Sequence, residues 1–124
     1  MFFNEKFLDV INHKGVVSIV TCGDGEAHVS NTWNDYLTIV DENKILIPAA
    51  GMMKTERYTK ENPLVKLTIG SHEVMGYMYM GTGFYVEGNA KFLREGADFD
   101  MMKEKYPFLS RVLEVTVTSY KQTL

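Results

Sequence analysis

A run of small residues between a predicted strand and a predicted helix is the part of this sequence best suited to hold a ligand. Residues 44–48 are apolar enough for a buried strand, residues 49–51 are Ala-Ala-Gly, and a helix is expected from about Met52. The first turn of a helix has backbone N–H groups without intrahelical partners and carries the positive end of the helix dipole. Lys54 and Thr55 add an ammonium and a hydroxyl group there. This combination favours a phosphate site, although an ordinary strand-to-helix turn has the same pattern.

A second group of candidate residues lies at the end of the strand predicted for residues 27–33. Asn31 and Thr32 offer amide and hydroxyl groups, and Trp33 offers the only indole ring of the chain. Taken alone, a single tryptophan is more typical of a core anchor. A planar heterocycle with a phosphate needs a flat apolar slot, N–H donors for its ring and a cation for its phosphate. The two segments together supply all three, which indicates a binding site.

Sequence motifs typical of metal sites, hydrolases and nucleotide-binding loops are either absent or lie in the wrong structural context. The three histidines, His13, His28 and His72, are not spaced as metal ligands, so no metal site is predicted. The sequence has no G-x-S-x-G hydrolase motif and no P-loop. Gly-Thr-Gly at residues 81–83 begins like a dinucleotide-binding motif, but it precedes a strand rather than a helix. No catalytic residue is therefore assigned.

Composition is typical of one folded domain that binds a small molecule. The 124 residues are 45% hydrophobic and 12% aromatic, which suits a single domain over residues 1–124. The net charge of -3 and the lack of a long basic run disfavour nucleic acid or a membrane as a partner. Cys22 is the only cysteine, which fits a reducing, cytoplasmic compartment, and we expect it in the core. The N-terminus shows no signal-peptide pattern.

Strand patterns dominate the chain. Strands are expected at residues 16–22, 27–33 with a continuation through 36–40, 44–48, 64–69, 84–92 and 112–120, and helices near residues 4–15, 52–61 and 97–106. An aromatic and Met-rich loop is expected at residues 74–83. Gly-Asp-Gly at residues 23–25 is a hairpin signal, which favours antiparallel pairing. A closed or nearly closed barrel would remove exposed sheet edges.

Four short motifs occur in order along the chain: Asn-Thr-Trp-Asn-x-Tyr-Leu at residues 31–37, Gly-Met-x-Lys-Thr-Glu at 51–56, Gly-Thr-Gly-Phe at 81–84 and Gln-Thr-Leu at 122–124. In order and spacing they resemble the small FMN-binding proteins of sulfate-reducing bacteria, within the pyridoxamine 5'-phosphate oxidase-like group. The resemblance implies a mainly β fold, a six-stranded antiparallel split β-barrel of Greek-key type with two or three short helices. It also implies a homodimer with one non-covalent FMN per subunit near the dimer interface.

The resemblance further implies roles for individual residues. Lys54 and Thr55 would hold the phosphate, and residues 31–33 would line the flavin and its ribityl chain. The backbone of residues 49–51 would pass close to the ring, and Leu124 would approach it. The cofactor-binding residues implied in this way are Asn31, Thr32, Trp33, Ala49, Ala50, Gly51, Lys54, Thr55, Phe108 and Leu124.

The chain departs from the family pattern at several positions. Ala50 replaces the first glycine of a Gly-Gly pair, and its added methyl group would narrow the approach to the ring. Phe108 falls where a tryptophan of the partner subunit shields the flavin, and it is smaller. Tyr-Met-Tyr-Met at residues 77–80 replaces a polar loop, either by simple divergence or as an apolar contact patch. His13 falls where the family has an acidic residue close to the flavin.

The function expected from the resemblance is that of an FMN-binding flavoprotein that takes part in electron transport. One alternative is an oxidoreductase on the same fold, such as an NAD(P)H-dependent flavin reductase; the chain looks too short for a pyridoxamine phosphate oxidase. A second alternative is a cofactor-free β-barrel interaction module, and a third is a deazaflavin or haem ligand in the same slot. The sequence does not identify the redox partner protein or nicotinamide donor, nor whether a substrate is turned over.

Overall fold

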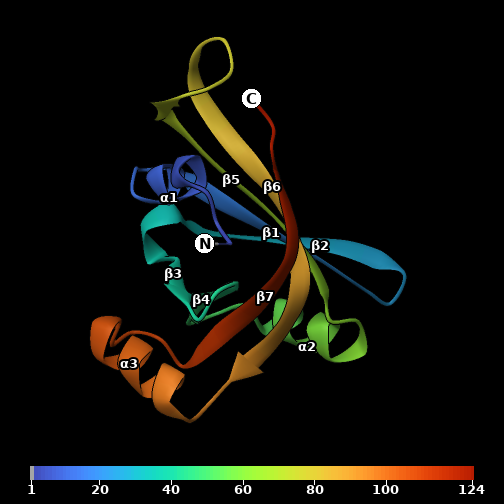
Figure 1. The fold of residues 1–124 in the computed structure, drawn as a ribbon. Helices are drawn as coiled ribbons and strands as arrows, with labels where there is room; N and C mark the ends of the chain where they lie inside the picture. The colour runs from blue at the N-terminus through green and yellow to red at the C-terminus, as the bar shows by residue number, and fades with distance from the viewer. Residues whose placement is uncertain (1) are drawn as a thin grey trace.

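The computed structural model describes residues 2–124, which form one antiparallel sheet and three α-helices, while Met1 lies outside the described residues (Figure 1). The strands are β1 (Val16–Gly23), β2 (Glu26–Trp33), β3 (Thr38–Val40), β4 (Lys44–Ala49), β5 (Leu64–Met75), β6 (Met80–Leu93) and β7 (Arg111–Gln122). The helices are α1 (Glu5–Ile11), α2 (Met53–Glu61) and α3 (Ala97–Lys105), and a 3-10 helix (Asn34–Tyr36) joins β2 to β3. The prediction of a mainly β, antiparallel fold with short helices is confirmed.

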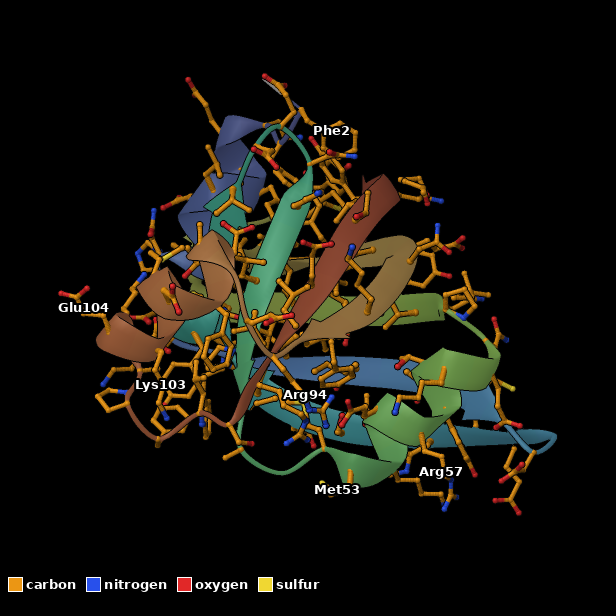
Figure 2. All side chains as sticks on the ribbon, turned by 90° about the horizontal axis from the view of Figure 1, so that it is seen from below. Phe2, Met53, Arg57, Arg94, Lys103 and Glu104 are labelled. Carbon is orange, nitrogen blue, oxygen red and sulfur yellow. The ribbon has the colours of Figure 1, made fainter. Side chains whose placement is uncertain are left out.

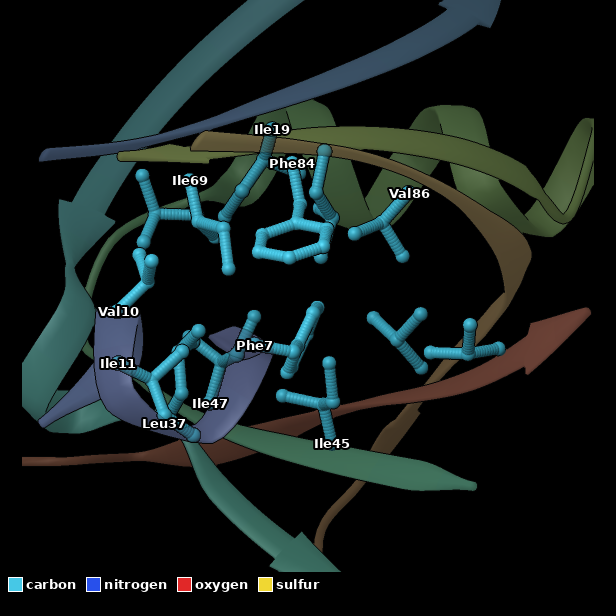
Figure 3. Close-up of a cluster of buried hydrophobic side chains, with 14 of the residues drawn as sticks. Phe7, Val10, Ile11, Ile19, Leu37, Ile45, Ile47, Ile69, Phe84 and Val86 are labelled. Atoms are coloured by element: carbon cyan, nitrogen blue, oxygen red, sulfur yellow. The ribbon is translucent and has the colours of Figure 1, made fainter. Parts of the chain in front are cut away.

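The sheet is strongly curved around its apolar face. Its strand order is β2-β1-β5-β6-β7-β4-β3, so β2 and β3 are the edges, and no pairing within residues 2–124 joins them. Long antiparallel strands coil, and this brings the two halves of the sheet face to face. Figure 3 shows Ile19, Ile69 and Phe84 on one side of the core and Ile45 and Ile47 on the other. The result is a barrel-like core that hydrogen bonds do not close.

Helix α1 packs against this core. Its N-cap is Asn4, as predicted, and the Asn4 side chain accepts a hydrogen bond of 2.8 Å from the backbone N–H of Phe7. The Phe7 ring is fully buried, and its centroid lies 4.4 Å from that of Phe3 and 5.2 Å from that of Phe84. Burying one such ring contributes about 2–3 kcal/mol.

Within the described chain, no helix has the length and apolar character to cross a membrane.

The number of strands differs from the prediction. Six strands are expected from the sequence, because the second strand is predicted to continue into the residues of β3, whereas the sheet has seven strands. The chain turns at Asn34, which is fully buried. Its side-chain Nδ2 lies 3.2 Å from the carbonyl oxygen of Val10, 3.1 Å from that of His13 and 2.9 Å from that of Gly70. This amide fixes the 3-10 helix, so β3 begins a separate strand that pairs with β4.

The predicted loop at residues 74–83 was also wrong in part. β5 continues to Met75 and β6 begins at Met80, so the chain forms a long hairpin that projects from the sheet (Figure 1). The ladder is irregular between Ser71 and Met75. The tip carries the Tyr-Met-Tyr-Met run at residues 77–80, whose side chains are all exposed. A strand ladder thus places this run, for which the sequence left open simple divergence or an apolar contact patch, at the end of a defined arm.

The prediction that Cys22 is a core residue is wrong. Alternate residues of a strand face opposite sides of the sheet. In β1 the buried residues are Val17, Ile19 and Thr21, and Gly23 follows them in the same register. Cys22 therefore lies on the opposite face, where its side chain is exposed.

Candidate functional site

The predicted phosphate site is formed by the first turn of α2 and the connection that precedes it; Figure 2 shows Met53 at the start of this helix. Met52 is the N-cap and supplies no side-chain cap, and the backbone N–H of Glu56 donates to its carbonyl at 2.9 Å. The three amides between them have no intrahelical acceptor, and the helix dipole is positive here. The exposed side chain of Lys54 lies over the ring of Tyr58, with Nζ 5.5 Å from the centroid. These groups suit an anion.

Thr55 is fully buried, and its Oγ1 lies 3.0 Å from Oγ of Ser30 on β2. The Thr55 hydroxyl, which was predicted to hold a phosphate, therefore contacts the neighbouring strand. The backbone N–H of Thr55 remains in the first turn of α2. Ser30 is not among the site residues predicted from the sequence. Strand alternation was the available signal, because it places Ser30 and the buried Thr32 on the same face of β2. The contact brings the two predicted segments together.

The connection from β4 to α2 is held on its carbonyl side by the start of β7. The backbone N–H of Ser110 donates to the carbonyl of Ala49 at 2.9 Å. The Ser110 hydroxyl lies 3.3 Å from the same oxygen and 3.4 Å from that of Ala50. The guanidinium of Arg111 donates to the carbonyl of Gly51. No heavy atom beyond the chain neighbours lies within 4 Å of the place where a side chain at Gly51 would begin, so the backbone is open to solvent at this residue.

A buried ion pair lies directly behind this connection. Arg111 is 5% exposed and Glu56 is 6% exposed. Nε of Arg111 lies 2.9 Å from Oε1 of Glu56, but its N–H does not point at the oxygen, so the contact is an ion pair rather than a hydrogen bond. Arg94 adds a two-pronged contact to the same carboxylate, with Nη2 at 3.1 Å from Oε1. No local sequence pattern predicts this cluster of Glu56, Arg94 and Arg111.

The charges around Glu56 keep it ionised. The hydrogen bond from Arg94 is the largest cause that holds the pKa of Glu56 below its ordinary value of 4.5, and the positive charges of Arg111, Arg94 and Lys60 act in the same direction. Burial opposes this shift, because it disfavours the charged form. The carboxylate can therefore serve as a fixed anchor for Arg111 at neutral pH.

Trp33 lies at the surface rather than in the core. It is 53% exposed and borders a hollow of about 240 Å³. The lining residues of this hollow are Lys14, Gly15, Trp33, Asp35 and Tyr36. The ring of Phe108 lies 5.7 Å from that of Tyr36, so Phe108 extends the same aromatic surface. Two residues later Ser110 binds the connection to α2, which links this surface to the phosphate site.

Asn31 lies on the same face of β2 as Trp33, because alternate residues of a strand face the same side. Nδ2 of Asn31 lies 3.2 Å from Oγ of Ser18 on the neighbouring strand. His13 is turned towards α1, with Nδ1 2.8 Å from the carbonyl oxygen of Asp9, and its neighbour Lys14 lines the Trp33 hollow instead. Leu124 lies beside the tip of the β5–β6 hairpin, whereas α2 lies at the other end of the molecule (Figure 1). One chain does not bring Leu124 to the phosphate site.

The fold is that of a small, open antiparallel barrel, in which the predicted phosphate site lies next to exposed backbone at Gly51. The chain belongs to the pyridoxamine 5'-phosphate oxidase family, whose model matches residues 3–124. It is 39% identical over 118 residues to a protein of Nitratidesulfovibrio vulgaris (strain DSM 19637 / Miyazaki F) named FMN-binding protein, an alignment that covers 95% of this chain and 96% of that protein. The resemblance found in the sequence is confirmed.

Solved structures share the fold. HupZ of Group A Streptococcus superposes with a TM-score of 0.80 at 14% identity, covering 97% of this chain and 93% of that chain. An FMN-binding protein from Syntrophomonas wolfei superposes with a TM-score of 0.76 at 18% identity, covering 97% of this chain and 85% of that chain. At such identities the likeness shows the fold alone, which is the split barrel implied by the sequence motifs.

Proposed function

We propose that this chain binds FMN, with the phosphate on the first turn of α2 and the flavin ring across the connection that precedes it. The observation that carries the proposal is the uncapped start of α2, with Lys54 beside it and free space at Gly51. Support also comes from the 39% identical relative, which is named an FMN-binding protein. FMN has three parts, and each needs a different subsite. The phosphate needs a cationic subsite, the ribityl chain a polar one and the flat ring an apolar one.

The residues present fit these three parts. The amides of the first turn of α2 and the ammonium of Lys54 would hold the phosphate. Polar side chains of β2 next to α2, such as Ser30, would lie along the ribityl chain. The flavin ring would lie across the connection at Gly51, with the exposed face of Trp33 as a neighbouring aromatic surface. Bound FMN would supply the redox chemistry, and the protein would bind, orient and shield it.

We propose electron transfer as the role, because the groups at this site are suited to binding and none forms an acid–base pair. The competing role is a flavin reductase with a nicotinamide donor. Stopped-flow mixing of the FMN-loaded chain with NADH or NADPH separates the two roles. A carrier would be reduced slowly, with a rate proportional to donor concentration; a rate that saturates with donor would identify a reductase. The cytoplasmic location expected from the sequence remains a prediction.

A homodimer would complete the site. Leu124, at the end marked C in Figure 1, lies too far along the molecule to reach a flavin held by its own α2. The side chains of Trp33 and Phe108 are exposed and, with the partly exposed Tyr36, leave an aromatic surface open to solvent. A two-fold dimer could bring the Leu124 end of one copy to the flavin of the other and cover this surface. Sedimentation at micromolar protein should give a dimer, and a monomer at all concentrations would refute this part of the proposal.

Replacing Lys54 with alanine tests the phosphate site. A charge-assisted bond to the phosphate contributes about 1.5–3 kcal/mol, so Lys54→Ala should weaken FMN binding roughly 10- to 150-fold. The matched control is Lys60→Ala at the other end of the same helix, which should change the Kd less than about twofold. Flavin fluorescence titration measures both constants. Equal affinities in the two variants would place the phosphate elsewhere.

A further inference from the structure

The connection between β4 and α2 is held through three consecutive carbonyl groups. The backbone N–H and the hydroxyl of Ser110 contact the carbonyl oxygen of Ala49, and the hydroxyl also lies near that of Ala50. The guanidinium of Arg111 donates to the next carbonyl, that of Gly51. All three carbonyls therefore point towards the start of β7.

The N–H groups of the same three peptides face the other way. In a planar trans peptide the C=O and the N–H point in opposite directions, so the N–H groups of Ala50, Gly51 and Met52 point away from Arg111. No hydrogen bond within residues 2–124 uses these three N–H groups. Ala50 and Gly51 are exposed. The connection therefore carries a row of free donors on the face that does not contact β7.

Met52 has a backbone conformation that non-glycine residues rarely adopt. Its φ of 64° and ψ of 32° lie in the left-handed region. The next residue, Met53, begins α2, and a left-handed residue beside a helical one turns successive N–H groups towards a common point. Such a conformation persists only where the surroundings hold it. The bond from Arg111 to the carbonyl directly before Met52 is one contact that does so.

Arg111 also places a positive charge directly behind the connection. Two guanidinium groups, of Arg111 and Arg94, contact the one carboxylate of Glu56, which leaves one net positive charge in this cluster. Arg111 and Glu56 are both buried, so water screens their charges less than it screens charges at the surface.

These features bear on the redox chemistry of a flavin. Reduction places negative charge on the flavin ring, and fixed donors and cations that stabilise this charge raise the reduction potential. We propose that Arg111 sets the potential of FMN bound on this connection, by presenting the N–H groups of Gly51 and Met52 to the ring and by its own charge. Arg111 is thus a positioning residue, and Glu56 opposes its charge. The inference rests on the proposed FMN site and concerns the potential rather than binding as such.

Two substitutions of opposite charge test this role. The readout is the Kd for oxidised FMN divided by the Kd for reduced FMN, because this ratio gives the shift in potential from that of free FMN. A buried unit charge within about 10 Å of the ring should change the ratio about tenfold. Arg111→Met should therefore lower the ratio about tenfold, which is about 30 mV for a two-electron couple, and Glu56→Gln should raise it by a similar factor. Anaerobic dithionite titration beside a reference dye measures the potentials directly.

The opposite signs separate charge from loss of structure. Both variants disturb the same buried cluster, and a disordered connection would move both potentials in one direction, towards that of free FMN. The matched control is Arg57→Met, which removes a positive charge at an exposed position of α2 and should change the ratio less than about twofold. Arg111→Lys keeps the charge and should lie closer to the wild type than Arg111→Met does. Unchanged potentials in Arg111→Met and Glu56→Gln, or shifts of the same sign, overturn the proposal.

The outcome for the FMN proposal is visible separately. If the wild-type chain binds FMN but the potentials do not follow the charge, the role of Arg111 falls and the FMN site stands. If the wild-type chain does not bind FMN, both proposals fall. Thermal unfolding shows whether each variant folds. If Arg111→Met does not fold, Glu56→Gln decides, because an unchanged or lowered potential in that variant overturns the role of Arg111.

Discussion

Replacing Arg111 with methionine tests whether this buried guanidinium holds the connection between β4 and α2. Methionine keeps the apolar stem and can still pack on the ring of Phe92, whose centroid lies 5.5 Å from the guanidinium carbon. The change removes the hydrogen bonds to the carbonyl of Gly51 and, at 2.7 Å, to the hydroxyl of Ser110. It also removes one of the two arginines in contact with Glu56.

The loss of stability in Arg111→Met depends on the contacts that Glu56 retains with Arg94. Removing one partner of a buried ion pair costs about 3–5 kcal/mol, because the remaining charge is left uncompensated. Arg94 stays bonded to the carboxylate, but its own side chain is 58% exposed, so it compensates in part. We therefore expect Arg111→Met to lower the free energy of unfolding by about 2–3 kcal/mol. Combining it with Glu56→Gln should cost about 1–2 kcal/mol less than the sum of the single changes.

Urea unfolding of the wild type, the two single variants and the double variant measures this cycle. The control is Arg57→Met, an exposed arginine of α2 that lies 3.7 Å from Asp24 and should cost less than about 1 kcal/mol. If Arg111→Met costs no more than Arg57→Met, or if the cycle is additive, the ion pair does not anchor the connection. A connection that loses its anchor should also bind FMN more weakly, which a flavin titration would detect.

Two further predictions concern buried polar groups. Because Arg94 holds the pKa of Glu56 below 4.5, the stability from this carboxylate is complete above pH 4.5 and is lost as the pH falls through the lowered pKa. Urea unfolding from about pH 6 to pH 3 should show the difference between wild type and Glu56→Gln shrinking at the acid end, and a constant difference would contradict this. Asn34→Leu leaves buried carbonyls without their donor and should cost about 2–4 kcal/mol by thermal unfolding. A loss below about 1 kcal/mol would mean that water replaces the amide.

Elements with local signals could be predicted from the sequence. Asn4 was recognised as a helix cap, and α2 ends at Glu61 because Pro63 cannot continue a helix. The turn at Asn34 could not be predicted, because the three carbonyl groups that fix it lie between 21 and 36 residues away along the chain. A buried amide looks the same in a sequence as an exposed one, so the pattern predicts a strand that continues past Asn34.

In the candidate site, too, residues in local motifs could be predicted, and residues that depend on long-range contacts could not. Lys54 and Trp33 belong to short motifs and could be predicted as site residues from the sequence. That Trp33 is exposed could be seen only in the fold. Arg94 and Glu56 are 38 residues apart, and Arg111 binds a carbonyl 60 residues away. Contacts of this kind depend on the order of the strands, which no local pattern encodes.

The exposed side chain of Cys22 has a practical consequence for measuring association. It is the only thiol of the chain and lies close to the β1–β2 turn. A nitroxide attached there would sit at one place in each molecule, so two associated copies would yield one interspin distance without an engineered cysteine. An accessible thiol also oxidises in air. Covalently joined pairs would then form in buffers without a reductant, and they would imitate non-covalent assembly on a sizing column.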